Sequence, residues 1–289
     1  MVGAPLAEFL RRTGHFRGKR RLLRLWSRHQ RGTRTRVLPG GLTISLDVRS
    51  DYEAHIWLRL EERAELAALP GLLSPGDVFV DCGANLGLWS LVAAPLVGDR
   101  GKVIAFEPNP RTAERLSRNA EQAHGVIDVR AIAVTDRQGR VRLDPGDRHN
   151  VSRVSPTGTI EVPATTLDQA LDAPPTGIKI DVEGQELAVL RGARRVLEGR
   201  PWLAIEFSAE HSPSRRLGDW AVHSHLDSLG YRPFTFHGEQ LGGDWRLRRD
   251  YANLLYREPD GLGAERRSAG RTSPSAASSA WRMQSSMSM

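Results

Sequence analysis

The sequence contains little cysteine and no long apolar run. Its 289 residues include one cysteine, Cys82, which excludes a disulfide framework and a cysteine-based zinc site. Because no stretch of 18 apolar residues exists, we expect no transmembrane segment. The N-terminus lacks the continuous apolar core of a secretory signal, so the expected location is cytoplasmic.

Lysine is also scarce, because only three of the 41 basic residues are lysines: Lys19, Lys102 and Lys179. Lys179 lies in IKIDVEGQE (178–186), a segment whose apolar members favour a buried strand. A lysine delivers one compact cation on a flexible stem, whereas an arginine carries a rigid fork. The choice of lysine at position 179 therefore indicates a carboxylate partner nearby.

The positive charge is concentrated near the N-terminus. Residues 1–36 carry eleven Lys or Arg and one acid, Glu8, a net charge of +10, so the remaining residues sum to −3 of the total of +7. Two interpretations of this basic arm stay open. It contacts an anionic surface such as nucleic acid, an acidic partner or anionic lipid, or it is a solvated, partly helical extension.

The hydrophobic pattern predicts an α/β fold. Segment 37–48 has strand-turn-strand character, and 51–69 reads as one amphipathic helix. From residue 77 onward, short apolar runs alternate with helical segments, which is typical of a mostly parallel sheet with helices on both faces. The seven strand candidates are 77–82, 102–106, 127–134, 178–182, 201–207, 231–236 and 251–257.

Composition and loop length then divide the chain. The connection 136–165 is too long for an ordinary loop and is expected to form a hairpin or lid over the site. Residues 259–289 are rich in Ser, Ala, Gly and Arg and are expected to be disordered. The predicted organisation is a basic arm (1–36), a strand-turn and helix (37–75), a core domain (76–258) and a tail (259–289).

A glycine turn follows the first predicted core strand in VFVDCGANLGLWSLVAA. Gly83 and Gly87 permit a tight turn into a helix. Twenty residues later Glu107 ends the next strand, where an acid can accept hydrogen bonds from both hydroxyls of a ribose. The second glycine of the dinucleotide fingerprint is missing. Asp81 before the turn instead suits a ligand with a cationic amino-acid portion, such as S-adenosylmethionine; the alternative is a plain strand-helix connection.

The strand at 178–182 places Lys179, Asp181 and Glu183 on one side, because side chains alternate along a strand. Open α/β sheets bind ligands beyond the carboxyl ends of their strands. Asp181, with Glu183, is therefore predicted to touch the reacting hydroxyl or the charged end of the cofactor, while Lys179 keeps that carboxylate ionised. The alternative is an ion pair that only fastens the strand.

A second cluster, Glu206, Glu210 and His211, follows the fifth strand in IEFSAEHSP. His211 is a candidate general base, because neutral imidazole accepts a proton near pH 7. His149 and Asn150 are weaker candidates for substrate contact. No His/Asp cluster has metal-ligand spacing, so no metal is predicted, although Asp181 with a distant acid could bind Mg²⁺.

The sequence resembles the FkbM family of S-adenosylmethionine-dependent methyltransferases over roughly residues 50–236. The resemblance lies in DCGANLG (81–87), AFEPNP (105–110), AIAVTDRQG (131–139), TTLDQAL (165–171) and IKIDVEGQELAVLRGA (178–193). It implies a Rossmann-like, seven-stranded methyltransferase fold that binds S-adenosylmethionine. The cofactor residues it implies are Asp81, Gly83, Asn85, Gly87 and Glu107, with Asp136 in the stretch that borders the adenine.

The resemblance implies O-methylation of a hydroxyl on a sugar, glycolipid or secondary metabolite. A nucleic-acid methyltransferase that uses the basic arm is an alternative. It is disfavoured because the body is slightly acidic and no Asn-Pro-Pro-Tyr-like element for a flipped base is present. A noncatalytic protein that keeps the fold is the third hypothesis, and it leaves the retained acids unexplained.

Overall fold

The computed structural model describes residues 9, 19–30, 32–60, 62–145, 152–248 and 250–259. His149 and Asn150 lie outside the described residues, and so does the expected tail from residue 260 onward. Within the described helices, none is both long enough and apolar enough to cross a membrane.

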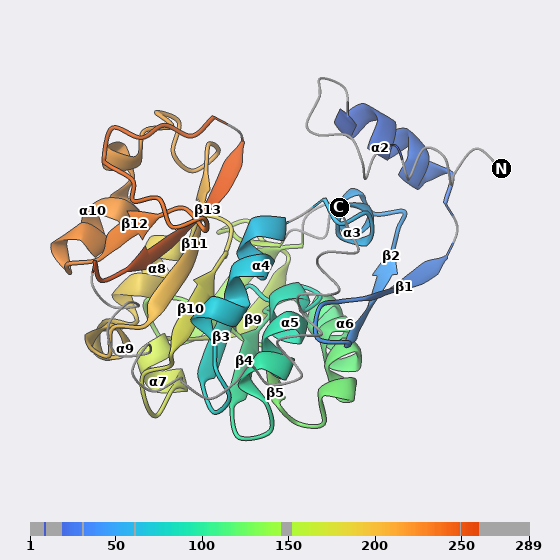
Figure 1. Ribbon diagram of the computed structural model, residues 1–289, viewed down its shortest axis with the longest axis horizontal. Coiled ribbons are helices and arrows are strands. Elements are labelled where there is room, and N and C mark those ends of the chain that lie inside the picture. Colours follow the sequence, from blue (N-terminus) through green and yellow to red (C-terminus); the bar gives the residue numbers. More distant parts are fainter. Residues whose placement is uncertain are drawn as a thin grey trace.

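A seven-stranded sheet forms the centre of the molecule, in the order β12, β13, β11, β10, β3, β4, β5 (Figure 1). Strands β11, β10, β3, β4 and β5 run parallel, whereas β13 runs antiparallel to both of its neighbours. The α/β class and the seven strands are confirmed, and the sheet is mixed. The strands are β3 (Val78–Cys82), β4 (Lys102–Phe106), β5 (Ile127–Arg130), β10 (Gly177–Ile180), β11 (Trp202–Ser208), β12 (Arg232–Phe234) and β13 (Tyr251–Arg257).

Helices cover both faces of this sheet, and alternation along each strand divides the core in two. In β4, Val103 and Ala105 join one cluster, while Ile104 and Phe106 join the other. The first cluster includes apolar residues of α4, α5 and α6, and the second those of α7 to α10 (Figure 1). These helices are α4 (Arg63–Leu72), α5 (Leu88–Val97), α6 (Pro110–Ala120), α7 (Leu167–Ala170), α8 (Glu186–Arg191), α9 (Arg194–Glu198) and α10 (Ala221–Ser228).

The segment before the sheet packs onto its first face. Helix α2 (Lys19–Arg28) contacts α3 (Asp51–Trp57), and the hairpin of β1 (Thr33–Val37) and β2 (Thr43–Asp47) hydrogen-bonds to α6 through Ser45 and Asn119. Helix α2 and most of β1 therefore lie within the predicted basic arm. The domain boundaries stay a prediction.

The single helix predicted over 51–69 is wrong. The chain forms α3 and α4 instead, because Arg59 and Glu62 adopt left-handed backbone angles, with φ of 58° and 49°. Left-handed residues cannot continue a right-handed helix. The break turns Glu62 toward the carboxyl ends of the sheet strands, where it becomes part of a cavity wall.

The long connection 136–165 contributes to a second, four-stranded sheet in the order β6, β9, β7, β8. The predicted run 127–134 is split, since its last two residues leave the main sheet to form β6. The strands are β6 (Ala133–Val134), β7 (Gly139–Asp144), β8 (Arg153–Val154) and β9 (Ile160–Thr165).

Candidate active site

A cavity of about 260 Å³ opens at the carboxyl ends of β3, β4, β10 and β11. In a parallel sheet these ends leave a crevice that loops can wall. Five carboxylic acids and a set of apolar residues share the wall. The lining residues are Tyr52, Glu62, Gly83, Asn85, Phe106, Glu107, Pro108, Ile132, Ala133, Val134, Leu143, Ser152, Val154, Asp181, Val182, Glu183, Gln185, Glu206, Tyr251 and Asn253.

Lys179 lies at the floor of this crevice and is 5% exposed. Its Nζ donates to the Gly83 carbonyl oxygen at 2.9 Å and lies 3.1 Å from Asp181 Oδ2. Burial would lower the pKa of Lys179, but the charges of Asp181, Asp81 and Glu62 outweigh it and raise that pKa. The lysine therefore carries a full positive charge directly against Asp181.

Asp81 lies beneath the cavity rather than in its wall. It is fully buried on β3, opposite Lys179 in the strand register. Its Oδ2 accepts a hydrogen bond from Ser90 Oγ at 2.7 Å, and its Oδ1 lies 3.7 Å from Lys179 Nζ. Burial raises the pKa of Asp81, against the opposing effect of Lys179. The sequence predicted that Asp81 contacts a cationic ligand. In the structure Asp81 lies against Lys179, so it could act on such a ligand only through that lysine.

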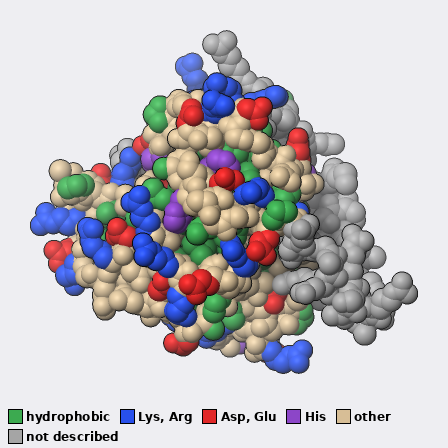
Figure 2. Space-filling view, turned by 90° about the vertical axis from the view of Figure 1, so that its left-hand side faces the viewer, with side chains coloured by type: hydrophobic (Ala, Val, Ile, Leu, Met, Phe, Trp, Pro, Cys, Tyr) green, Lys and Arg blue, Asp and Glu red, His purple; other side chains and the backbone are tan. Residues whose placement is uncertain are grey.

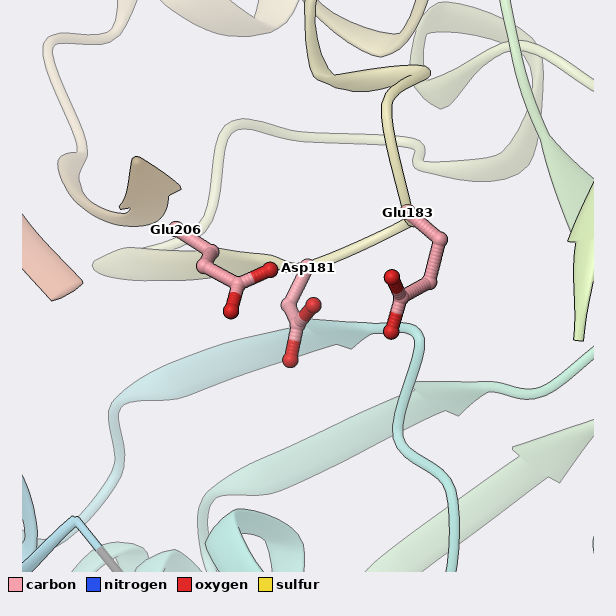
Figure 3. Close-up of side chains that lie close together, drawn as sticks. All are labelled: Asp181, Glu183 and Glu206. Atoms are coloured by element: carbon pink, nitrogen blue, oxygen red, sulfur yellow. The ribbon is translucent and has the colours of Figure 1, made fainter. Parts of the chain in front are cut away.

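Three carboxylates meet at one side of the cavity (Figure 3). Asp181 follows β10, Glu183 lies two residues further on with a left-handed φ of 55°, and Glu206 belongs to β11. One oxygen from each lies within 4.8 Å of the others. Carboxylate oxygens at this spacing could hold a divalent cation such as Mg²⁺. Burial and the charge of Asp181 raise the pKa of Glu183 to about 7 and that of Glu206 to about 10.

Glu107 occupies the opposite wall, just beyond β4, and is 6% exposed. Its Oε2 accepts a hydrogen bond from the Asn85 amide and its Oε1 from the Asn109 amide, both at 2.9 Å. Burial raises the pKa of Glu107 to about 7, and the two amides oppose that rise. Each carboxylate oxygen accepts more than one hydrogen bond, so both remain able to receive a ligand hydroxyl.

Gly83 and Gly87 allow close packing against neighbouring segments, in addition to the tight turn. A Cβ on Gly83 would lie 1.8 Å from the Asp181 carbonyl oxygen, and one on Gly87 would lie 2.4 Å from Leu116 Cδ1. The Gly83 amide already donates to the Phe106 carbonyl oxygen and is not free for a ligand. Asn85 offers a buried Oδ1 without a hydrogen-bond partner among the described residues. Of the two turn residues that line the cavity, Gly83 and Asn85, Asn85 therefore offers the unpartnered acceptor.

Besides Asp81 and Lys179 beneath the cavity, three predicted residues do not line it: Gly87, Asp136 and His211. The Asp136 side chain is 37% exposed, and its Oδ1 lies 3.7 Å from Arg137 Nη1. Ala133 and Val134, from the same stretch, do line the cavity. His211 lines a separate hollow, with its ring against Gly184. The structure therefore does not bring His211 together with Asp181 in the cavity.

Sequence reasoning missed Glu62 and Asn253. Asn253 Nδ2 lies 3.4 Å from Glu62 Oε1, and burial raises the pKa of Glu62 to about 8. Asn253 arrives on the antiparallel strand β13, directly opposite Glu206. No local motif marks either residue, because the helix break and the strand reversal that place them are tertiary features.

Residues of the long connection form part of the cavity wall. Leu143, Ser152 and Val154 line it, and Ser152 Oγ accepts a hydrogen bond from Asn109 Nδ2 at 2.8 Å. Arg153 Nη1 lies 2.8 Å from Glu210 Oε1, and this ion pair joins the long connection to the loop after β11. These contacts link both rims of the crevice.

Comparison with known proteins places the chain among methyltransferases. A curated relative, the hexuronic acid methyltransferase AglP of Haloferax volcanii, is 28% identical over 167 residues, which are 55% of this chain and 68% of AglP. The crystal structure of a methyltransferase FkbM from Methylobacillus flagellatus aligns with a TM-score of 0.44 and 18% identity, covering 89% of this chain. This chain spans only 59% of that protein. TYW2 of P. horikoshii, solved with MeSAdo, aligns with a TM-score of 0.45 and 14% identity, covering 78% of this chain and 69% of TYW2.

The model of the methyltransferase FkbM domain matches residues 81–233, just over half of the chain. The match begins at Asp81 and includes the glycine turn, Glu107, the charged strand and Glu206. The chain therefore belongs to the FkbM family of S-adenosylmethionine-dependent methyltransferases.

Proposed function

We propose that this protein transfers the methyl group of S-adenosylmethionine to a hydroxyl oxygen of a sugar-containing acceptor. The observation that carries the proposal is Asp181, a carboxylate paired with a buried lysine and facing the cavity that Glu107 also lines. The sugar class is supported by the similarity to AglP, which is described as acting on a hexuronic acid. The strand order, with β3 between β10 and β4, supports a Rossmann-like arrangement.

The wall opposite Asp181 offers acceptors and an apolar surface that suit S-adenosylmethionine. Glu107 offers two carboxylate oxygens for the ribose hydroxyls, and Asn85 offers its unpartnered Oδ1. Phe106, Ile132 and Val134 give the apolar surface that suits an adenine ring. A ligand with sulfonium and ammonium charges would favour the ionised forms of the wall acids, because a nearby positive charge opposes the rise in pKa that burial causes. When bound, the cofactor would supply an electrophilic methyl group on a cationic sulfur, and the sulfur–methyl bond would break to leave a neutral thioether.

The chain's own residues then orient the acceptor and move one proton. The acceptor hydroxyl donates to the Asp181 carboxylate, which takes the hydroxyl proton as the oxygen forms its bond to the methyl carbon. Lys179 holds the Asp181 carboxylate in place throughout. The rim contacts of Asn109 with Ser152 and of Arg153 with Glu210 restrict water, and alignment of the acceptor supplies much of the rate.

Neutralising Glu107 should weaken cofactor binding. In Glu107→Gln one charged acceptor is lost, and the Kd for S-adenosylmethionine should rise about 10- to 100-fold by calorimetry. In the parent protein, Glu107 has a pKa of about 7 and must be ionised for both of its oxygens to accept from the two ribose hydroxyls. A proton competes below that pKa, so the Kd should rise as the pH falls from about 8 to about 6, and Glu107→Gln should lose this dependence.

The matched control is Glu198→Gln at the exposed end of α9, which should leave the Kd and its pH dependence unchanged. A Glu107→Gln variant that binds the cofactor as tightly as the parent would refute the ribose role.

Offering defined acceptors tests the reaction itself. Purified protein with methyl-tritiated S-adenosylmethionine should label glycans that contain hexuronic acid, and mild alkali should not release the label, because a methyl ether resists hydrolysis. Alkali-labile label would indicate a methyl ester and overturn transfer to a hydroxyl. Label in RNA or DNA alone would favour the nucleic-acid alternative, and cofactor binding with no label in any pool would favour a noncatalytic role. The cytoplasmic location stays a prediction.

A further inference from the structure

The large hydrophobic side chains that are exposed among the described residues all lie at the N-terminal end of the chain. They are Phe9, Leu25 and Val37, which are 48%, 46% and 56% exposed. On the face toward α9 and α10, by contrast, basic and acidic side chains are interspersed, with apolar side chains scattered among them (Figure 2). Phe9 and Leu25 lie within residues 1–36, the segment with a net charge of +10, and Val37 directly follows it.

Helix α2 is already docked on the body by one face. Leu23 and Trp26 are buried, Trp26 stacks on Trp57 of α3 with ring centroids 5.5 Å apart, and Ser27 Oγ donates to Asp51 Oδ1 at 3.2 Å. Arg21 and Leu25, one turn apart, are exposed. Because the helix is held in this orientation, Leu25 cannot be buried by a tighter fit of α2 to the same body.

An exposed leucine on a basic helix fits a lipid surface. Five of the ten residues of α2 are Lys or Arg and none is acidic. Anionic lipid attracts the basic residues, and only an apolar phase favours the burial of Leu25. Nucleic acid would account for the basic residues of α2 but not for the exposed Leu25. Trp26, the aromatic residue of α2, is buried and cannot stack on a base. We propose that α2 attaches this protein peripherally to an anionic lipid bilayer.

The proposed contact lies beside the cavity. Helix α2 packs on α3, and α3 supplies Tyr52 to the cavity wall. Figure 1 shows α2 and α3 next to each other at one end of the molecule, away from α9 and α10. A bilayer bound through α2 is therefore near the α3 side of the cavity.

Vesicle sedimentation of the full chain tests this contact without any assay of methyl transfer. The protein should sediment with vesicles of phosphatidylcholine containing about one-third phosphatidylglycerol, and hardly with phosphatidylcholine alone. The apparent partition coefficient should fall about fivefold in Arg21→Gln and about tenfold in Leu25→Ser. Arg194→Gln on the exposed surface of α9 is the matched control for charge and should bind as the parent does.

Circular dichroism confirms that each variant is folded. Equal binding to neutral and anionic vesicles, or no binding to either, would overturn the proposal. So would Leu25→Ser retaining the parent's partition coefficient. If short RNA binds tightly and displaces the protein from vesicles while Leu25→Ser has no effect on either, the arm is a nucleic-acid contact instead.

Discussion

Asp181→Asn should lower kcat by about 10²- to 10⁴-fold, measured at saturating cofactor with the labelled acceptor. Asparagine keeps the size of the side chain and still occupies the cavity wall, but it cannot accept the hydroxyl proton. Its amide would also face Lys179 Nζ, which lies 3.1 Å from Asp181 Oδ2 in the parent. Because the cofactor is saturating, the loss reports the transfer step rather than weaker cofactor binding.

Asp99→Asn is the matched control, because Asp99 is exposed in the turn after α5, at the other end of the sheet strands. Its kcat should equal that of the parent. A kcat for Asp181→Asn close to the parent's would show that another group takes the proton. If EDTA abolishes activity of the parent and Mg²⁺ restores it, Asp181 acts with Glu183 and Glu206 as a cation ligand.

Lys179→Met should lower the free energy of unfolding by about 3–5 kcal/mol, measured by urea denaturation. Methionine matches the length of the lysine stem but carries no charge and no donor. Asp81, the Gly83 carbonyl and Asp181 would then lose their shared partner, and Asp81 is fully buried. The cost comes mainly from leaving those groups unpaired, because a buried ion pair as a whole adds little net stability.

A second substitution separates this mechanism from simple loss of packing. Asp81→Asn in the Lys179→Met background removes the buried unpaired charge, so it should recover part of the lost stability. Lys102→Met, at the start of β4, is the matched surface control and should cost less than about 1 kcal/mol. A Lys179→Met protein as stable as the parent would mean that water reaches Asp81.

The sequence predicted the central framework because that framework depends on local periodicity. Each of the seven predicted runs overlaps a strand of the main sheet. Glu107 and Asp181 follow strands directly, so the rule that ligands bind beyond carboxyl ends was enough to place them in one cavity.

The remaining features depend on interactions between distant segments. The break between α3 and α4 arises at two left-handed residues that no glycine or proline marks. His211 looked suitable by its chemistry, yet the loop after β11 turns it toward Gly184 and away from the cavity. Glu206 reaches Asp181 because β11 pairs with β10, and this register is not readable from either strand alone.

Gly83 packs closely against the Asp181 carbonyl. This packing joins the glycine turn, which carries the proposed cofactor contacts, to the segment that carries the proposed base. Lys179 Nζ also donates a hydrogen bond to the Gly83 carbonyl oxygen. The turn is therefore held to β10 and to the residue after it by this hydrogen bond and by the close packing. If Asn85 and Glu107 bind the cofactor as proposed, a shift of the turn on binding should also move Asp181, the proposed proton acceptor. Under the proposed function, cofactor binding and the alignment of Asp181 would thus be coupled through Gly83, where a side-chain methyl group would force the two segments apart.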